Sequence, residues 1–375
     1  RDVAPSRGLG DVYKRQRSPR AEQKHNVVIV LMESMSSKFL TENRYPGQPV
    51  ITPTLDRLSK EGLFFSRTYA SGTRSVRGIE AVNLSIPPLP GQSIVRRPGN
   101  ENLHGLGPVF AEKGYDNKWI YGGYGYFDNM NAFLGGNGFR VVDRTVWADG
   151  EITFANAWGA ADEDTFAKVI KEADKSYASG KPFLTLLLTI SNHRPYTYPS
   201  GKVSLTGGRE GGVQYADYAI GEFLRRAESK PWFDNTIFVF VADHTAGAAG
   251  DEEIDLEGHH IPWIIYAPKL VKARRIDMPV SQLDVLPTLL GLLNFDYESR
   301  FYGQDALSPD YESRFFVSNF QKIGYVKNGA GVILKPVRDY AVLPAGTQPP
   351  HVQTLLDEAV AFYQSASHWK HFLKK

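Results

Sequence analysis

The sequence contains no cysteine among its 375 residues. This absence excludes disulfide bonds, thiolate metal ligands and a cysteine nucleophile, so any catalytic chemistry must use oxygen and nitrogen atoms. Long apolar runs are also missing. The longest, residues 27–32 and 183–190, are far shorter than the roughly 20 residues that span a bilayer.

The charge is nearly balanced, with 43 Lys and Arg residues against 41 Asp and Glu residues and a formal net charge of +2. No run of basic residues alternates with stacking aromatic residues, so we expect no nucleic-acid partner. Hydrophobic residues make up 42% of the chain and charged residues 22%. This is the composition of a globular chain long enough for one large domain or two modest ones.

Residues 1–16 show neither a helical nor a strand period, and residues 8–16 resemble an artefact of cloning or sequence assembly. We therefore predict that residues 1–23 lie outside the fold as an artefact-like or disordered stretch. Because the chain begins with Arg rather than Met, we also expect that a natural N-terminal segment, such as a membrane anchor, is missing.

Three apolar runs predict strands that are buried on both faces of a parallel sheet. Polar residues able to bind a metal follow each run. Glu33 follows the run 27–32, and Asp243 and His244 follow the run 236–242. Ser191, Asn192 and His193 stand at the end of the run 183–190. Ligands of open α/β sheets bind beyond the carboxyl ends of the strands, so we expect these residues to meet at one site.

Segments with helical spacing lie between the runs and predict a doubly wound α/β fold with a mostly parallel sheet flanked by helices. They are residues 54–61, 103–113, 162–178 and 215–229. Residues 263–267 predict a further strand. We interpret residues 86–99 and 121–138, which are rich in Pro or Gly, as long loops over the site.

The pattern changes after residue 303. Short alternating runs at 324–327 and 331–337 predict a small antiparallel β segment, and a terminal helix is predicted near 353–373. We therefore expect residues 24–303 to form the catalytic domain and residues 304–375 to pack on that same domain.

Asp243 and His244 form an oxygen and nitrogen pair that can bind a divalent cation, and the small residues from Thr245 to Gly250 follow as a loose loop. The alternative is that Asp243 and His244 lie in a surface turn that binds no metal. Glu33 favours the metal, because a carboxylate at the end of a buried strand needs a partner.

Residues 71–80 combine hydroxyl groups with arginines. A hydroxyl beside a metal loses its proton more easily and becomes a nucleophile, and Thr73 and Ser75 both qualify. Arg74 and Arg77 could neutralise phosphate oxygens. The alternative is that these hydroxyls cap the helix that follows.

Three histidines complete the candidate set. His193, and further along His259 with His260, could hold a phosphate oxygen or protonate a leaving alkoxide. A structural hydrogen bond is the alternative for any single histidine.

Taken in order from about Asn26 to Gly303, these motifs resemble the alkaline phosphatase and sulfatase superfamily. The motifs are Glu33, Thr-Pro-Thr-Leu-Asp-Arg-Leu from Thr52, the Ser75 loop, Ser-Asn-His at 191–193, Ala-Asp-His at 242–244, and residues 281–290. Within that superfamily the sequence is most similar to the lipoteichoic acid synthase-like phosphoglycerol transferases.

The resemblance implies one divalent metal ion, with Mn²⁺ favoured and Zn²⁺ or Mg²⁺ as alternatives. Its ligands would be Glu33, Ser75, Asp243 and His244, converging around one ion. The family usually has Thr as nucleophile, and Ser75 departs from it by lacking the β-methyl group. Ser75 is preferred over Thr73 because the related phosphoethanolamine transferases place the nucleophile three residues after a Gly, here Gly72.

The resemblance also implies substrate contacts. His193 corresponds to the histidine that binds the substrate phosphate and serves in catalysis, and His260 resembles a histidine near the phosphate or a second metal. Phe127, Asp128 and Asn129 occupy the segment that grips the headgroup in the family; the alternative is an ordered aromatic loop.

The expected activity is phosphoglycerol transfer from phosphatidylglycerol to a glycan, polymer or lipid hydroxyl, through a phospho-seryl intermediate, at the outer face of the bacterial cytoplasmic membrane. The alternatives are a phosphoethanolamine transferase, a phosphodiesterase or sulfatase-type hydrolase, and a sulfatase-like binding module without catalysis. Residues 75–79 lack the Pro and Arg of the motif that sulfatases convert to formylglycine. Phosphoethanolamine transferases are typically rich in disulfides, which this chain cannot form.

Overall fold

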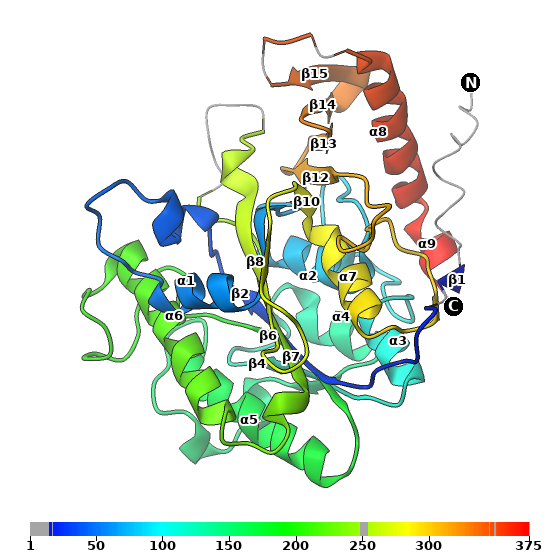
Figure 1. The fold of residues 1–375 in the computed structure, drawn as a ribbon. Helices are drawn as coiled ribbons and strands as arrows, with labels where there is room; N and C mark the ends of the chain where they lie inside the picture. The colour runs from blue at the N-terminus through cyan, green and yellow to red at the C-terminus, as the bar shows by residue number, and fades with distance from the viewer. Residues whose placement is uncertain (1–14, 17, 248–253, 345, 349, 375) are drawn as a thin grey trace.

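The computed structural model describes residues 15–16, 18–247, 254–344, 346–348 and 350–374 (Figure 1). A nine-stranded sheet forms the centre of the molecule. Its strands, in spatial order, are β10 (Val280–Ser281), β3 (Leu63–Tyr69), β8 (His260–Tyr266), β7 (Thr236–Ala242), β2 (Asn26–Met32), β6 (Phe183–Leu188), β4 (Asp116–Tyr121) and β5 (Arg140–Val142), with β9 (Arg274–Ile276) paired to β3. The predicted doubly wound, mostly parallel sheet is confirmed.

Strand β2 lies in the middle of the sheet and is parallel to both of its neighbours. It pairs with β7 from Asn26–Thr236 to Met32–Ala242, and with β6 from Val27–Leu184 to Leu31–Leu188. Every residue of β2, β6 and β7 is buried, as expected for strands covered on both faces. Because the three strands are parallel, their carboxyl ends lie at the same edge.

Strand β8 runs antiparallel to both β7 and β3. Its first residue, His260, therefore lies at the edge where the parallel strands end. This orientation brings the segment before β8 to the same edge as the ends of β2 and β7.

Helices cover both faces of the sheet (Figure 1). One face carries α1 (Pro53–Glu61), α5 (Asp162–Ala178) and α6 (Gly208–Ala227), and the other carries α2 (Ser75–Leu84), α3 (Leu106–Glu112) and α7 (Val285–Leu292). Helix α1 begins at Pro53, and its first free amides, of Thr54 and Leu55, donate to the buried carboxylate of Asp217 at 2.9 and 2.8 Å. A side chain of α6 therefore caps α1.

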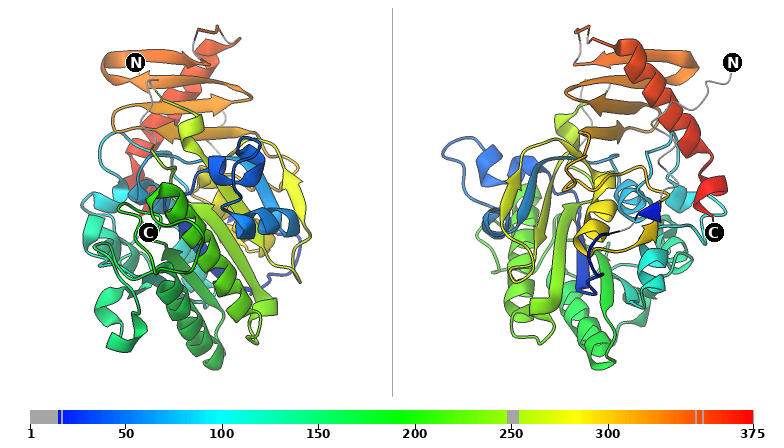
Figure 2. Two further views of the ribbon diagram at one scale, coloured as in Figure 1. Left: turned by 90° about the vertical axis from the view of Figure 1, so that its left-hand side faces the viewer. Right: turned by 45° about the vertical axis from the view of Figure 1, so that its right-hand side comes forward.

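A second sheet stands beyond one end of the main body (Figure 2). Its antiparallel strands are β12 (Arg314–Ser318), β13 (Ile323–Lys327), β14 (Ala330–Lys335) and β15 (Asp339–Leu343). Helix α8 (Val352–Ser367) packs on β13 and β14, and α9 (Trp369–Leu373) follows it. Strand β12 contacts β3 and β10, which attaches the small sheet to the main body.

The sequence prediction missed or misplaced several elements. It did not include β3, β4, β5 or the small helix α4 (Met130–Gly135), which lies inside the predicted loop 121–138. Helix α6 begins seven residues before the predicted 215, and the terminal helix is broken at His368. Strand β3 alternates apolar and polar residues only weakly, and β5 has three residues, so neither has a clear period.

Most of the stretch predicted to lie outside the fold, residues 1–14 and 17, falls outside the described residues, as do residues 248–250 of the predicted loop. Of the remainder, β1 (Arg15–Gln16) pairs antiparallel with β11 (Tyr297–Glu298), and the Ser18 amide donates to Asp296 at 2.7 Å. In the part of the chain that the structure describes, every helix is too short or too polar to span a bilayer.

Candidate metal and catalytic site

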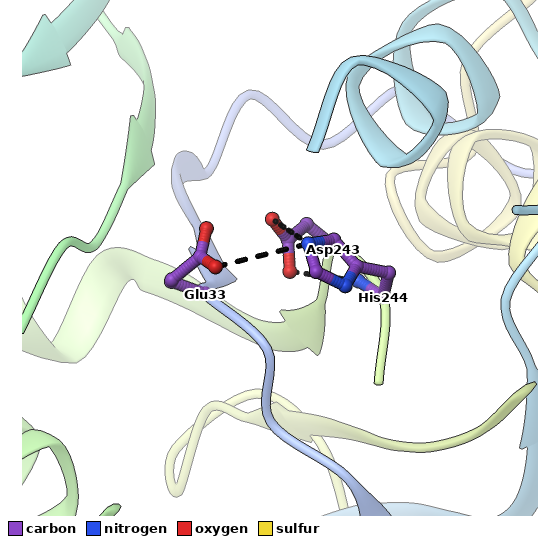
Figure 3. A group of neighbouring side chains, drawn as sticks. All are labelled: Glu33, Asp243 and His244. Atoms are coloured by element: carbon purple, nitrogen blue, oxygen red, sulfur yellow. Dashed lines mark hydrogen bonds and ion pairs between the residues drawn. The ribbon is translucent and has the colours of Figure 1, made fainter. Parts of the chain in front are cut away.

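Glu33, Asp243 and His244 form a cluster at the carboxyl edge of the main sheet (Figure 3). Glu33 follows β2 and Asp243 follows β7. Because Met32 is paired with Ala242, the next residue of each strand arrives at the same place. One ligand atom from each of the three residues lies within 4.8 Å of the others.

The cluster has its own short-range contacts. Glu33 accepts hydrogen bonds from Ser34 Oγ at 2.7 Å and from Ser75 Oγ at 3.1 Å. His244 Nε2 lies 3.7 Å from Glu33 Oε1 and 3.5 Å from Asp243 Oδ2. These distances bring all four residues predicted as metal ligands together around one point.

The two carboxylates of the cluster carry more negative charge than its single imidazole can neutralise. Burial and the neighbouring charge of Glu33 raise the pKa of Asp243 to about 7. Burial alone would raise the pKa of Glu33, but the His244 charge, the hydrogen bond from Ser34 and the His193 charge together outweigh burial and lower that pKa. Burial disfavours the charged imidazole of His244, yet Asp243 and Glu33 outweigh burial and raise its pKa. Two buried carboxylates thus share one imidazole as their nearest cation.

These residues fit a divalent cation. Asp243 Oδ2 is buried and, among the described residues, has no hydrogen-bond partner. A buried carboxylate oxygen without a partner is costly, and a cation would satisfy it. Two carboxylates, an imidazole and a hydroxyl form a donor set that Zn²⁺ and Mn²⁺ accept.

Helix α2 carries Ser75 into the cluster. Ser75 is the first residue of α2, so its hydroxyl lies at the positive end of the helix dipole. The helix can come this close because it has Gly78 where it meets β7: a Cβ at that position would lie 2.5 Å from the Asp243 carbonyl oxygen. Gly78 therefore sets the distance between Ser75 and the carboxylates.

Gln282 joins the two segments that carry the cluster. Its side-chain amide donates to the carbonyl oxygens of Ala242 and Asp243 at 2.8 and 2.9 Å. Its side-chain oxygen accepts from the Ser71 amide at 3.1 Å. Gln282 is completely buried, so these bonds connect the end of β7 with the loop before α2. The sequence prediction did not single out this residue.

The turn after β6 brings in His193. Asp162 at the start of α5 accepts hydrogen bonds from the amides of Ile190 and Ser191 at 2.8 and 3.1 Å. Burial raises the pKa of Asp162 to about 6. Asn192 donates to the Glu33 carbonyl at 2.9 Å, and the His193 ring lies 4.1 Å from the Trp158 ring. These contacts orient His193 toward the pocket.

An open pocket of about 680 Å³ lies in front of the cluster. Eight of the predicted site residues or alternatives line it, namely Glu33, Thr73, Arg74, Ser75, Phe127, Asp128, His193 and His244. Trp158, Arg194, Arg209, His259 and Asn319 also line it, and the prediction did not include them as site residues. His259 was a candidate beside His260, and Arg194 directly follows the Ser-Asn-His motif, whereas Trp158, Arg209 and Asn319 belong to segments without a recognisable motif.

Arg74 and Asp128 are paired in this pocket. Asp128 lies 3.2 Å from the Arg74 guanidinium and 3.0 Å from that of Arg96. Asp128 and Asn129 both have a left-handed backbone, with φ of 51° and 64°. Non-glycine residues adopt this conformation only where the surrounding structure imposes it.

Three of the predicted substrate-binding residues lie outside the pocket lining. Arg77 is buried against Glu80 and donates to the carbonyl oxygens of Leu89 and Gly91. Asn129 donates to the Val95 carbonyl at 2.8 Å. His260 contacts the Ser66 carbonyl at 2.7 Å, whereas its neighbour His259 lines the pocket. His259 is the last residue before β8 and His260 is the first residue of that strand, and their side chains contact different parts of the molecule.

A mostly parallel sheet with an acidic and imidazole cluster at its carboxyl edge defines an alkaline phosphatase-like protein. The sequence profile of the Sulfatase family matches residues 25–295. The chain therefore belongs to the Sulfatase family.

Curated relatives and solved structures both resemble the chain. It is 28% identical over 245 residues to phosphoglycerol transferase I of Citrobacter koseri and 27% identical over 258 residues to that of Salmonella paratyphi B, covering 59% and 62% of this chain. The chain spans only 31% and 32% of the length of these relatives.

A Vibrio parahaemolyticus protein of the alkaline phosphatase superfamily has a TM-score of 0.89 and 32% identity, with 97% of this chain and 92% of that chain covered. The lipoteichoic acid synthase LtaP of Listeria monocytogenes has a TM-score of 0.78 and 18% identity, with 98% and 99% covered. The second likeness shows a shared fold.

Proposed function

We propose that this chain is the catalytic part of a metal-dependent phospho-transferase that acts on a phospholipid headgroup, with phosphatidylglycerol as the favoured donor. The observation that carries the proposal is the Ser75 hydroxyl, 3.1 Å from Glu33 inside the acidic cluster and at the first turn of α2. The names of the curated relatives, phosphoglycerol transferase I, support the transferred group.

A divalent cation, with Mn²⁺ favoured, would be held by Glu33, Ser75, Asp243 and His244 and would supply positive charge that lowers the pKa of the serine hydroxyl and attracts phosphate. The protein's own residues position the reacting groups. Glu33 accepts the Ser75 proton through their hydrogen bond, and the amino end of α2 favours negative charge at the attacked phosphate.

The reaction proceeds in two displacements. Ser75 Oγ attacks the phosphorus of the donor, and the bond between phosphorus and the diacylglycerol oxygen breaks. His193, or a water molecule, protonates that leaving oxygen, and a phospho-seryl intermediate remains. An acceptor hydroxyl then attacks the same phosphorus and gives its proton to the base left by the first step, His193 or hydroxide. The bond between phosphorus and Ser75 Oγ breaks, and the proton held by Glu33 returns to Ser75.

Arg74 and Arg209 support the binding of an anionic group, because both residues line the pocket and carry a positive charge. The acceptor is a glycan, polymer or lipid hydroxyl. The resemblance to lipoteichoic acid synthase-like proteins supports a position at the outer face of a bacterial cytoplasmic membrane, with the full-length protein anchored there.

The test is an assay with fluorescent phosphatidylglycerol and, separately, phosphatidylethanolamine, in the presence of Mn²⁺ and with or without EDTA. We expect diacylglycerol release from phosphatidylglycerol that depends on the metal and disappears in Ser75→Ala. Preference for phosphatidylethanolamine would reassign the donor, and free glycerol phosphate as the main product would make the enzyme a hydrolase. No release from either lipid by metal-loaded protein would contradict the proposal.

A further inference from the structure

Exposed aromatic side chains gather beside the pocket mouth. Tyr126 is 69% exposed and Phe320 is 66% exposed, and Tyr124 and Phe127 are also exposed. We call these four residues the aromatic rim. Phe127 itself lines the pocket, Tyr124 and Tyr126 stack on one another, and Phe320 follows the pocket residue Asn319.

The two parts of the aromatic rim are attached to the same loop. The Gly91 amide donates to the Phe320 carbonyl at 2.7 Å, and Asn129, two residues after Phe127, donates to the Val95 carbonyl at 2.8 Å. Residues 91–95 thus bridge the turn between β12 and β13 and the loop after β4. The rim is therefore one structural unit, although its residues are almost 200 positions apart in the sequence.

Arginines lie between the aromatic rings. Arg74 and Arg96 flank Asp128, which directly follows Phe127, and Arg74 is 59% exposed at its side chain. Arg194 and Arg209 line the same pocket. Outside the acidic cluster, Asp128 and Asp255 are the described carboxylates that line this pocket. Four arginines therefore stand against two carboxylates, and the mouth keeps an excess of positive charge. Exposed aromatic residues mixed with arginine are the side chains found at the headgroup level of anionic membranes.

The chemistry of a diacyl phospholipid requires such a surface. The scissile phosphate is separated from the acyl esters by a single glycerol unit, so a donor phosphate beside Ser75 leaves its acyl chains close outside. A pocket of about 680 Å³ is the size that encloses one drug-sized molecule, which leaves the two acyl chains in their bilayer. The pocket mouth must then approach the membrane surface.

We propose that the aromatic rim docks on an anionic bilayer and places the pocket mouth at the headgroup layer. This proposal rests on the proposed function, because a lipid donor is what makes docking necessary. The rings of Tyr126 and Phe320 enter the interface, and the arginines between them bind the anionic headgroups.

The experiment is flotation of the protein, carrying Ser75→Ala, with phosphatidylglycerol-containing vesicles and with purely zwitterionic vesicles. Because this background has no turnover, the readout is independent of catalysis. We expect flotation with the anionic vesicles that weakens as salt rises, and about tenfold weaker partitioning in the double variant Tyr126→Ser, Phe320→Ser.

The matched controls are Tyr177→Ser at the end of α5 and Tyr340→Ser on β15, whose rings are 48% and 47% exposed but lie away from the pocket. Both should float like the parent. In an otherwise wild-type background, the rim variant should hydrolyse the soluble diester bis(p-nitrophenyl) phosphate at the parent rate while losing activity on vesicles.

Equal flotation of rim and control variants, or no flotation of the parent with anionic vesicles, would overturn the docking proposal. The proposal would also be overturned if the parent bound a soluble glucan but no vesicles and the rim variant lost that binding. The aromatic rim would then be assigned to the acceptor. Docking with no lipid turnover in the active protein would instead count against the proposed function alone.

Discussion

The hydroxyl of Ser75 is the atom on which the proposed chemistry depends. It touches Glu33, and Thr73 also lines the pocket two residues earlier. Only one of the two hydroxyls can occupy the attack position. The position of Ser75 at the start of α2, in contact with the acidic cluster, favours it.

We therefore expect Ser75→Ala to reduce turnover by at least about 10³-fold, because the change removes both a metal ligand and the attacking atom. Thr73→Ala should keep most of the activity, and Ser75→Thr should be tolerated, since the added methyl group changes rotamer freedom but not the oxygen. Kinetics and mass spectrometry of trapped intermediate provide the measurement. A phosphoryl group on Thr73 would show that the assignment is wrong.

At the scale of elements, the close packing of α2 on the end of β7 decides the geometry of the site. The contact is possible only because Gly78 has no side chain where the helix meets the Asp243 backbone. The separation between Ser75 and the two carboxylates thus depends on a residue that takes no part in the chemistry.

Gly78→Ala should push α2 away from β7 and weaken both metal binding and turnover, each by about tenfold or more, although alanine favours the helix itself. Metal titration by calorimetry and steady-state kinetics would measure the two effects. Gly150→Ala is the control, because no atom lies within 4 Å of its added Cβ. If Gly78→Ala binds metal and turns over like the parent, the packing argument fails.

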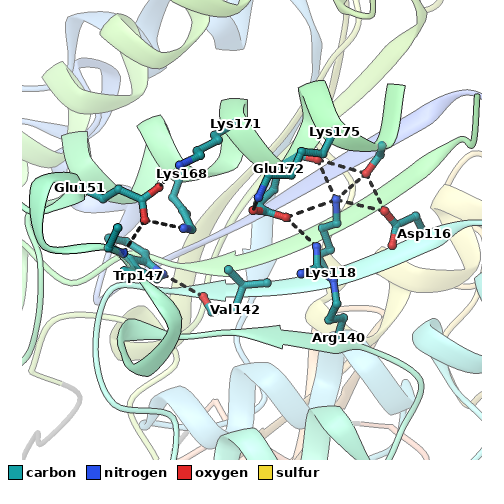
Figure 4. Close-up of polar contacts among 12 residues, drawn as sticks. Asp116, Lys118, Arg140, Val142, Trp147, Glu151, Lys168, Lys171, Glu172 and Lys175 are labelled. Carbon is teal, nitrogen blue, oxygen red and sulfur yellow. Dashed lines mark hydrogen bonds and ion pairs between the residues drawn. The ribbon is translucent and has the colours of Figure 1, made fainter. Parts of the chain in front are cut away.

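A second set of polar contacts joins α5 to the edge of the sheet, near the end remote from the pocket (Figure 4). Lys118 on β4 is almost completely buried and lies 3.0 Å from Asp116 and 3.5 Å from Glu172. Glu172 on α5 also contacts Lys175 and Arg140, each at 2.6 Å. The buried lysine is tolerated because carboxylates surround it.

Stability at acidic pH should depend on Glu172. Burial alone would raise its pKa, but Lys175, Arg140 and Lys118 lower it to about 2, below the ordinary 4.5. A depressed carboxyl pKa stabilises the folded state above the unfolded value and loses that contribution as pH falls from about 4.5 to about 2.

Glu172→Gln should therefore lower the free energy of unfolding by about 2 kcal/mol at pH 7, with the difference shrinking toward pH 2. Urea denaturation at a series of pH values would measure it. Glu222→Gln, which breaks the surface pair with Arg225, should change stability by less than about 0.5 kcal/mol. A pH-independent difference for Glu172→Gln would contradict the assigned shift.

At the scale of the whole molecule, the acidic cluster ties metal binding to stability. Residues after β2 and β7, the two central strands, carry it, and without a cation the charges of Glu33 and Asp243 oppose one another. Binding of a cation to the folded chain stabilises it by mass action.

Mn²⁺ at about 100 times its dissociation constant should add about 2.7 kcal/mol, which raises the melting temperature of a chain of this length by about 3 °C. EDTA should reverse the shift, and Asp243→Asn should abolish it. Differential scanning fluorimetry provides the measurement. An unchanged melting temperature in metal-loaded protein, with loading verified by elemental analysis, would argue against a site in this cluster.

Much of the fold was predictable from local pattern. Strands buried on both faces are continuous apolar runs, so residues 27–32 and 236–242 were recognised almost to the residue. Helix α5 was likewise predicted with its observed bounds, because its 17 residues keep a helical period. Elements with a short or mixed pattern, such as β5 and α4, were not.

The chemical groups that follow the central strands were predictable from local pattern. Glu33, Asp243 and His244 stand directly after apolar runs, and parallel pairing must then bring them to one edge. The neighbours that complete the pocket became known from long-range packing. Trp158 and Phe320 come from segments without periodic or motif signals, and the motif around Gln282 did not indicate that its side chain joins the end of β7 to the loop before α2. The antiparallel direction of β8 brings His259 and His260 to this edge, and His259 lines the pocket while His260 contacts the Ser66 carbonyl. Local pattern depends on residues a few positions apart, whereas these neighbours meet through packing between segments up to about 200 residues apart in sequence, which no local period encodes.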